Sequence, residues 1–240
     1  MRHSRILATA AMLCTLAACN NDEAMREIRD GQREIRAKMG DLEKKIDAIA
    51  SRPAAPAAGQ AQQPDPNKIY DLPVGNSPVR GDANGTVILT EFADFQCPFC
   101  ASAHQLVGQV LAAYPTGVKF VYKEFPLTSI HQNAMNASKA AQAAKAQGKY
   151  WEMHDKLFEN AKALDMDSLK KYAQEVGLDV ARWEKDMSSP EVQKQIQDDM
   201  QLASASGVRG TPTLFVNGKR VMTRTLEDIK KLIDEALKKA

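Results

Sequence analysis

Two cysteines separated by two residues, Cys97 and Cys100, lie between a short apolar run and a stretch typical of a helix. The apolar run at residues 87–92 predicts a buried strand, and residues 98–114 predict a helix that begins at Pro98. One helical turn brings the two sulfurs close enough to bond without a backbone rearrangement. Unpaired backbone N–H groups at the start of a helix stabilise a thiolate. The pattern therefore predicts a reactive Cys97 with its partner in reach.

The N-terminal residues have the composition of an export signal. Arg2 and Arg5 precede a short apolar segment that ends in Leu-Ala-Ala-Cys at residues 16–19, and this segment is too short for a spanning helix. The four-residue ending resembles a bacterial lipobox, which implies cleavage before Cys19 and acylation of that cysteine. We therefore expect a lipoprotein signal peptide at residues 1–18. The alternative is ordinary signal cleavage that leaves Cys19 as a free thiol.

The number of cysteines and the net charge limit the activities that the chain could have. Of the four cysteines, Cys14 leaves with the signal and Cys19 carries lipid, so Cys97 and Cys100 remain as the thiols of an exported protein. In an oxidising compartment, a CxxC pair indicates redox chemistry rather than half of a zinc site. Without the two arginines of the signal, 30 basic residues balance 30 acidic ones. That neutrality gives no indication of nucleic-acid binding.

A charged, helix-favouring segment follows the lipobox. Within it, Gln32 and a set of apolar residues recur at spacings of three and four, namely Met25, Ile28, Ile35, Met39, Leu42, Ile46 and Ile49. This spacing predicts a coiled coil, so we expect a lipid anchor and helical stalk at residues 19–50 and a homodimer or homotrimer formed through residues 25–49. A lone amphipathic helix is the alternative. Residues 51–68 are rich in Pro, Ala and Gln and predict a semi-rigid linker.

The remaining residues, 69–240, alternate strand and helix patterns. A second strand is predicted at residues 118–124, and strands at 213–216 and 219–222 flank the turn Asn217-Gly218. A final helix is predicted at 226–238. Between the second and third strands, residues 127–206 have helical composition, with breaks near residues 148, 165–167, 177–179 and 188–190 that indicate about four helices. The order predicts one α/β sheet interrupted by a helical insertion.

Two distant motifs carry a family resemblance. The run Glu-Phe-Ala-Asp-Phe-Gln-Cys-Pro-Phe-Cys at residues 91–100 and Gly-Thr-Pro-Thr at residues 210–213, with the helical block between them, resemble the DsbA-like branch of the thioredoxin superfamily. The resemblance extends from about Asp71 to the C-terminus. It implies a thioredoxin-like fold with an inserted helical subdomain, and thiol:disulfide exchange as the activity.

The resemblance also implies a role for individual residues. Cys97 would be the exposed nucleophile and Cys100 the buried resolving thiol. Pro212 would be a cis-proline facing the disulfide, and Thr211 would bind the substrate backbone. Glu91 would assist proton transfer at Cys100, which requires a buried carboxyl with a raised pKa. The alternative for Glu91 is an ordinary strand carboxylate that faces solvent.

One of the two residues between the cysteines differs from the residue at that position in the strong oxidants of this branch. Phe99 stands where those proteins often have a histidine, and a phenyl ring cannot donate a hydrogen bond to the Cys97 thiolate. We therefore expect the pKa of Cys97 at about 5–6 rather than at the extreme of about 3.5, which would make the disulfide a milder oxidant.

Other polar residues carry weaker signals. His104 shares a helix face with Cys100. Together with Cys97 these residues would supply only three of the four ligands of a structural zinc site, so we predict no metal site. His131 and His154 are expected on helical segments without partners. Lys123 and Glu124 are expected to be solvated charges at a strand end.

Together these features predict a periplasmic thiol:disulfide oxidoreductase that is lipid-anchored to the inner or outer bacterial membrane and forms disulfides in exported proteins. Its expected partners are unfolded or partly folded exported polypeptides and a membrane redox protein, with no organic cofactor. Three alternatives stay open. They are a disulfide isomerase or reductase on an oligomeric stalk, a metal-handling dithiol protein, and a structural tether with a vestigial CxxC.

Overall fold

The computed structural model describes residues 25–45, 47, 65 and 67–239. The predicted signal peptide, the lipid site at Cys19, the seam residues Ile46 and Ile49, and most of the predicted linker lie outside the described residues. The chain divides into two compact units, residues 1–62 and 63–240.

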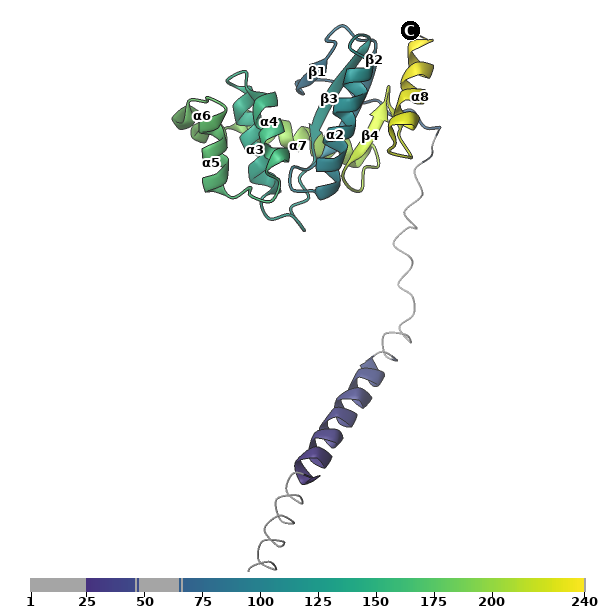
Figure 1. Ribbon diagram of the computed structural model, residues 1–240, viewed down its shortest axis with the longest axis vertical. Helices are drawn as coiled ribbons and strands as arrows, with labels where there is room; N and C mark the ends of the chain where they lie inside the picture. The colour runs from purple at the N-terminus through teal and green to yellow at the C-terminus, as the bar shows by residue number, and fades with distance from the viewer. Residues whose placement is uncertain (1–24, 46, 48–64, 66, 240) are drawn as a thin grey trace, which may run out of the picture. The chain divides into compact units, whose positions relative to one another are not determined.

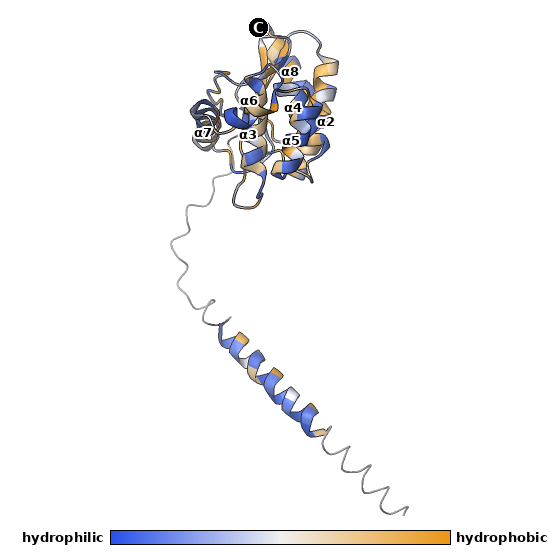
Figure 2. Ribbon diagram, turned by 90° about the vertical axis from the view of Figure 1, so that its left-hand side faces the viewer, coloured by the Kyte–Doolittle hydropathy of each residue, from blue (hydrophilic) through white to orange (hydrophobic). Residues whose placement is uncertain are grey.

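The first unit contains a helix over residues 25–45. Most of its residues are hydrophilic, with isolated hydrophobic residues along its length (Figure 2). The five described apolar residues of the predicted seam are each 50–60% exposed: Met25, Ile28, Ile35, Met39 and Leu42. Among the described residues, none of the helices combines the length and the apolar character that crossing a membrane requires.

The second unit is built on a five-stranded sheet with the order β1-β3-β2-β4-β5 (Figure 1). The two central strands, β2 (Val87–Ala93) and β3 (Val118–Glu124), run parallel and are joined by the helix α2 (Pro98–Ala113). The strands β1 (Val79–Gly81), β4 (Thr213–Val216) and β5 (Lys219–Arg220) pair antiparallel with their neighbours. The hairpin of β4 and β5 forms one edge of the sheet, and its turn is the Asn217-Gly218 pair that the sequence predicts.

The helical insertion between β3 and β4 contains five helices, one more than the sequence indicates. They are α3 (Ala134–Lys145), α4 (Tyr150–Glu159), α5 (Met166–Glu175), α6 (Val180–Asp186) and α7 (Pro190–Ala205), and α8 (Leu226–Leu237) follows the hairpin. Four of these helices start with a side-chain cap, in which Asp165, Asp179, Ser189 or Thr225 accepts a backbone N–H of the first turn. In Figure 1 the insertion lies on one side of the sheet region and α8 on the other.

Alternating residues of the central strands supply two hydrophobic cores. Leu89, Ala93, Phe120 and Tyr122 join the main core, together with residues of α2, α8 and the insertion. Phe92 and Phe215 point to the opposite face of the sheet, where they pack in a smaller cluster with Ala203 of α7. Because side chains alternate along a strand, Glu91 shares the face of Leu89 and Ala93, beneath α2.

The structure confirms the predicted α/β class and most strand positions, with two differences at the sheet edges. The strand β1 is not in the prediction, and the last strand ends at Arg220 rather than at residue 222. Both edge strands are two or three residues long, too short to show an alternating pattern.

Candidate active site

Cys97 lies at the N-terminus of α2, in the cap position. Its backbone is extended there, with φ −76° and ψ 120°. Its N–H donates to the carbonyl of Asp94 at 3.1 Å, and its own carbonyl accepts from the N–H of Cys100 at 3.0 Å. Pro98 occupies the first helical position, where a missing N–H costs no helical hydrogen bond. The sequence thus fixes the first cysteine at the helix start and the second one turn further on.

Both cysteines are free thiols, and they lie in very different surroundings. Cys100 is fully buried, and its Sγ lies 3.5 Å from the backbone N of Asp94. Burial, foremost, and then the neighbouring Cys97 and Glu91 raise the pKa of the Cys100 thiol above its ordinary value. At neutral pH the inner cysteine therefore keeps its proton.

The pKa of Cys97 is lowered to about 5. The largest cause is a hydrogen bond from the thiol of Cys100, and the side chain of Thr211 and the backbone N–H groups of Phe99 and Cys100 lower the pKa further, against the opposing effect of burial. This agrees with the lower end of the expected range. A thiolate at Cys97 with a protonated Cys100 beside it is the charge state that nucleophilic attack requires.

Cys97 is not the exposed residue that the family resemblance implies. Only 4% of it is accessible, whereas the neighbouring Phe99 is 66% exposed. The reason is that the loop before β4 covers the sulfur, with the carbonyl oxygen of Thr211 at 3.5 Å from Cys97 Sγ. A reacting group must therefore approach along that loop.

The covering loop contains a cis peptide bond between Thr211 and Pro212, as predicted. Two hydrogen bonds hold it: Thr213 Oγ1 donates to the carbonyl of Gly210 at 2.8 Å, and Arg224 Nη1 donates to the carbonyl of Pro212 at 2.8 Å. The hydroxyl of Thr211 is buried and has no hydrogen-bond partner among the described residues. The loop thus presents an unused hydroxyl beside the Cys97 sulfur.

Glu91 is 1% exposed, which excludes a solvent-facing carboxylate. Burial, foremost, and the charge of Cys97 raise its pKa to about 8, against the opposing effect of Arg224. The carboxyl is close enough to Cys100 that its charge also raises the pKa of that thiol. A buried acid that titrates near neutral pH beside the inner cysteine is suited to general acid–base work.

Lys123 and Glu124 are buried, contrary to the prediction of solvated charges. Lys123 faces α7, where its Nζ lies 3.3 Å from a carboxylate oxygen of the buried Asp199 and 3.2 Å from the carbonyl of Val74. Glu124 faces the insertion, and its Oε1 accepts hydrogen bonds from Tyr150 Oη at 2.9 Å and Gln142 Nε2 at 3.0 Å. The insertion supplies partners that a strand pattern alone does not reveal.

His131 and His154 both have partners, contrary to the prediction, and of the two only His154 lies on a helix, as predicted. His131 lies in the loop before α3, and its Nδ1 is 2.7 Å from Asp94 Oδ2. The same carboxylate accepts from the N–H groups of Gln96 at 2.7 Å and Leu127 at 2.9 Å. Asp94 therefore ties the segment before Cys97 to the loop that follows β3.

His104 and His154 belong to a polar cluster at the contact of α2 with α4. His154 Nδ1 lies 2.9 Å from Asp155 Oδ1, and His104 Nε2 lies 3.9 Å from the same oxygen. These three residues have the composition of a cation site. However, Arg80 already binds both oxygens of Asp155, at 3.0 and 2.7 Å, and its guanidinium stacks over Trp151. The cluster is accordingly an ion-pair network that fastens β1 to α4.

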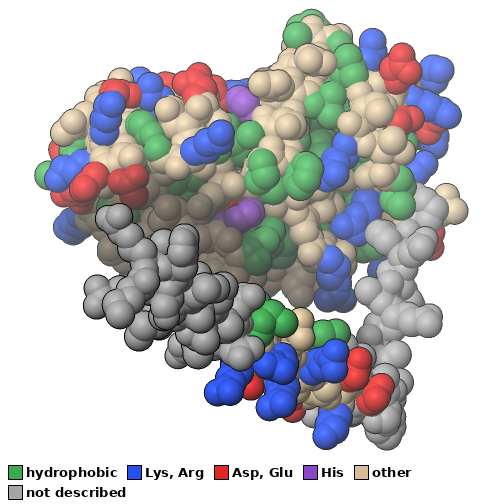
Figure 3. Space-filling view, turned by 60° about the horizontal axis from the view of Figure 1, so that its bottom comes forward, with side chains coloured by type: hydrophobic (Ala, Val, Ile, Leu, Met, Phe, Trp, Pro, Cys, Tyr) green, Lys and Arg blue, Asp and Glu red, His purple; other side chains and the backbone are tan. Residues whose placement is uncertain are grey.

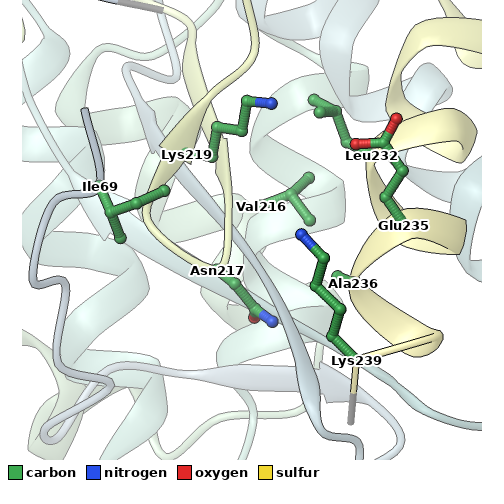
Figure 4. A pocket seen from close by; sticks show the side chains of 8 residues that line it. All are labelled: Ile69, Val216, Asn217, Lys219, Leu232, Glu235, Ala236 and Lys239. Carbon is green, nitrogen blue, oxygen red and sulfur yellow. The ribbon is translucent and has the colours of Figure 1, made fainter. Parts of the chain in front are cut away.

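A surface pocket lies between the β4–β5 hairpin and α8, away from the cysteines (Figure 4). Lys219 and Lys239 line it together with Glu235, Val216 and Leu232. Val216 ends β4, whereas Thr213, next to the cis-proline, begins it. The pocket is therefore at the opposite end of β4 from the sulfur atoms and does not contribute to the site.

The sheet, the cis-proline loop and the CxxC pair at the start of α2 define a thioredoxin-fold protein with an inserted helical subdomain. Residues 74–235 match the family model described as thioredoxin, and the chain belongs to this family. Its fold is that of the DsbA-like branch.

Among solved structures, the chain is similar to a thioredoxin-like oxidoreductase from Silicibacter pomeroyi DSS-3, with 34% identity and a TM-score of 0.64 over 69% of this chain and 95% of that one. It also shares its fold with BdbD from Bacillus subtilis, at 20% identity and a TM-score of 0.65, covering 71% and 97% of the two chains.

A curated relative is the Na(+)/H(+) antiporter NhaA 3 of Salinispora tropica, which is 40% identical over 156 residues. The match covers 63% of this chain but 24% of the antiporter, so this chain shares only a quarter of that protein's length.

Proposed function

We propose that this protein is an extracytoplasmic thiol:disulfide oxidoreductase that forms disulfides in exported proteins. The observation that carries the proposal is the asymmetry of the two cysteines, because the pKa of Cys97 is lowered to about 5 while that of the buried Cys100 is raised. Family membership supports an oxidoreductase. The exported location rests on the N-terminal signal pattern of the sequence.

In the oxidative direction a substrate thiolate attacks Cys97 Sγ of the Cys97–Cys100 disulfide. The S–S bond breaks, Cys97 forms a mixed disulfide with the substrate, and the electron pair leaves on Cys100, which takes a proton from Glu91. A second substrate thiolate then attacks the substrate sulfur of the mixed disulfide and releases Cys97 as a thiolate, so two electrons pass from substrate to enzyme. The low pKa of Cys97 makes it a good leaving group in this last step.

An extended polypeptide suits the surroundings of the sulfur. The backbone of Thr211 is available for strand-like pairing with a substrate, with the cis-proline Pro212 beside it. Exposed apolar side chains occur on the segments around the site, with Phe99 at 66%, Ile130 at 72% and Met222 at 56% exposure. Hydrophobic side chains also gather near the middle of the face that Figure 3 shows of the second unit, residues 63–240, which we call the head. Unfolded and partly folded chains expose apolar residues and match such a surface.

Two further features belong to this proposal. Acylation of Cys19 would hold the protein at the inner or outer bacterial membrane. Repeated turnover would require a membrane redox partner that restores the Cys97–Cys100 disulfide. No step in the exchange chemistry calls for an organic cofactor.

A second candidate function is disulfide isomerisation or reduction by several heads on a shared stalk. The exposed apolar residues of the helix at residues 25–45 favour it, because a homodimer or homotrimer formed through residues 25–49 would hide them. Linked heads raise the effective thiol concentration around one misfolded substrate. Replacing Ile35 and Leu42 by Asp would then reduce the mass in sedimentation, whereas replacing Lys44 by Asp, on the side of the helix away from the seam, would leave it unchanged.

The reduction potential of the Cys97–Cys100 pair, together with oxidation of a dithiol peptide, tests the proposed function. An oxidase has a potential above that of a structural disulfide, and the oxidised protein converts the peptide to its disulfide while the Cys97→Ser variant does not. Efficient refolding of a scrambled substrate would favour the isomerase, and a strongly negative potential would favour the reductase. Equal peptide oxidation by the parent and Cys97→Ser would contradict both.

A further inference from the structure

Three buried polar side chains lie on one face of the two central strands. Glu91 of β2 is the register partner of Tyr122 of β3, and Ala93 is the partner of Glu124. Because alternate residues of a strand share a face, Tyr122 and Glu124 point to the same side as Glu91, beneath α2 and the insertion. Each of the three residues is at most 1% exposed. The row begins at the inner cysteine and runs toward the insertion.

Each member of this row has a buried oxygen that is not hydrogen-bonded within the part of the chain that the structure describes. These atoms are Glu91 Oε1, Tyr122 Oη and Glu124 Oε2. Buried polar atoms almost always have a partner, and a polar site of this kind is where proteins hold an internal water molecule. Three such residues that are neighbours on one face of the sheet can therefore form a hydrogen-bonded path in which buried water bridges their oxygens.

Glu124, at the far end of the row, has surroundings that allow both its protonated and its ionised form. Glu124 Oε1 accepts hydrogen bonds from Tyr150 Oη and Gln142 Nε2, and these two donors stabilise a carboxylate. Burial opposes that charge, as does the nearby Asp199, so the pKa of Glu124 is raised to about 8. Glu124 Oε2 is the oxygen left to carry a proton toward Tyr122.

Ionisable groups on several neighbouring elements face the row. On α4, the His154 ring lies 4.8 Å from the Tyr122 ring, and burial lowers the pKa of His154 to about 4, so this histidine is neutral at pH 7. Cys97 and Cys100 of α2 and Arg224 of the segment before α8 act on Glu91. Burial raises the pKa of the Tyr122 phenol, and four charged or ionisable neighbours raise it further: Glu124, Tyr150, Cys100 and Glu91. Tyr122 thus stays a neutral hydroxyl, which can accept one proton and donate another, and both carboxyls lie within its electrostatic reach.

We propose that Tyr122 and Glu124 extend Glu91 into a buried proton chain that supplies the proton taken up by Cys100 when the disulfide opens. The proposal rests on the proposed function. Opening the disulfide creates a Cys100 thiolate, which takes the proton of Glu91. The Tyr122 hydroxyl, through a buried water molecule, then passes its proton to the Glu91 carboxylate and accepts the proton of Glu124. The net change is one proton moved from Glu124 to Cys100, with no change in the electron count.

The chain predicts a specific defect when the Tyr122 hydroxyl is removed. The opening of the disulfide in the oxidised full-length protein by dithiothreitol is followed by tryptophan fluorescence in Tyr122→Phe, in Glu124→Gln and in the parent protein. We expect both variants to open about tenfold more slowly at pH 7, with a smaller solvent deuterium isotope effect. In the parent the rate relative to the variants declines as the pH rises past about 8, where Glu124 loses its proton.

A matched control separates proton transfer from packing. Tyr172 of α5 donates its hydroxyl to the Ala163 carbonyl at 2.9 Å, within the insertion and outside the row. Tyr172→Phe therefore removes a comparable hydroxyl and is expected to keep the rate, isotope effect and pH profile of the parent. If Tyr122→Phe and Glu124→Gln behave like Tyr172→Phe while the parent exchanges disulfides, the chain is wrong and the proposed function stands. If the parent and Cys97→Ser oxidise a dithiol peptide equally, the proposed function is wrong, and the proton chain that rests on it is wrong as well.

Discussion

Replacing Glu91 by Gln is expected to make the folded protein less sensitive to rising pH. Burial raises the pKa of Glu91 from 4.5 to about 8. Because the folded-state value is the higher one, the stability contribution of the protonated carboxyl is complete below pH 4.5 and is lost as the pH rises toward 8. At pH 7, which is about 2.5 pH units above the unfolded-state pKa of 4.5, the lost contribution is about 3 kcal/mol at about 1.4 kcal/mol per unit. At pH 8.5 the lost contribution approaches about 5 kcal/mol.

The assay is urea unfolding of the reduced full-length protein and of Glu91→Gln at pH 4.5 and pH 7. Both tryptophans, Trp151 and Trp183, lie in the head, so their fluorescence reports on that unit. Relative to the parent, the free energy of unfolding of Glu91→Gln should rise by about 3 kcal/mol between the two pH values, a midpoint change of about 1–3 M urea. Glu235→Gln, at an exposed carboxyl of α8, controls for the lost charge. A constant difference between Glu91→Gln and parent at both pH values would refute the burial of an ionisable acid.

Three further outcomes are expected. Alkylation of Cys97 by iodoacetamide should follow a thiolate that titrates near pH 5, with no labelling of the buried Cys100; a midpoint near pH 9 would contradict the charge state described. Gly218→Ala should lower the free energy of unfolding by about 1–3 kcal/mol, because Gly218 has φ +77° and its Cβ would collide with the Tyr70 carbonyl, whereas Gly108→Ala in open space on α2 should be neutral or stabilising. Arg80→Lys should destabilise the head almost as much as Arg80→Ala in thermal unfolding, because a lysine cannot span both oxygens of Asp155; full retention of stability by the lysine variant would contradict the two-oxygen contact.

The central strands and the cysteine pair could be predicted because their signals are local. Residues 87–92 and 118–124 show apolar runs or alternation, Pro98 marks the helix start, and Asn217-Gly218 marks the hairpin. The structure finds each of these elements within a residue of the predicted position. Local backbone preferences therefore determine the frame that holds Cys97 and Cys100.

The environment of the charged residues could not be predicted in this way. The strand pattern predicts a solvated Lys123, but the structure pairs this lysine with Asp199 of α7, a helix of the insertion. The burial of Cys97 likewise depends on Thr211, more than a hundred residues later. A single sequence gives the residue types at these positions, but not the long-range contacts that bury them.

The most direct test of the central claim is which cysteine captures a substrate. Full-length Cys97→Ser and Cys100→Ser proteins, each also carrying serine at residues 14 and 19, are mixed with a peptide whose cysteine is joined by a disulfide to 5-thio-2-nitrobenzoate. The thiolate of Cys97 should attack the peptide sulfur in Cys100→Ser, release the coloured thiolate and leave a peptide adduct that mass spectrometry locates on Cys97. Cys97→Ser should form almost none, because Cys100 is buried and protonated. Equal adduct formation by the two variants would contradict the assignment of Cys97 as the attacking thiolate.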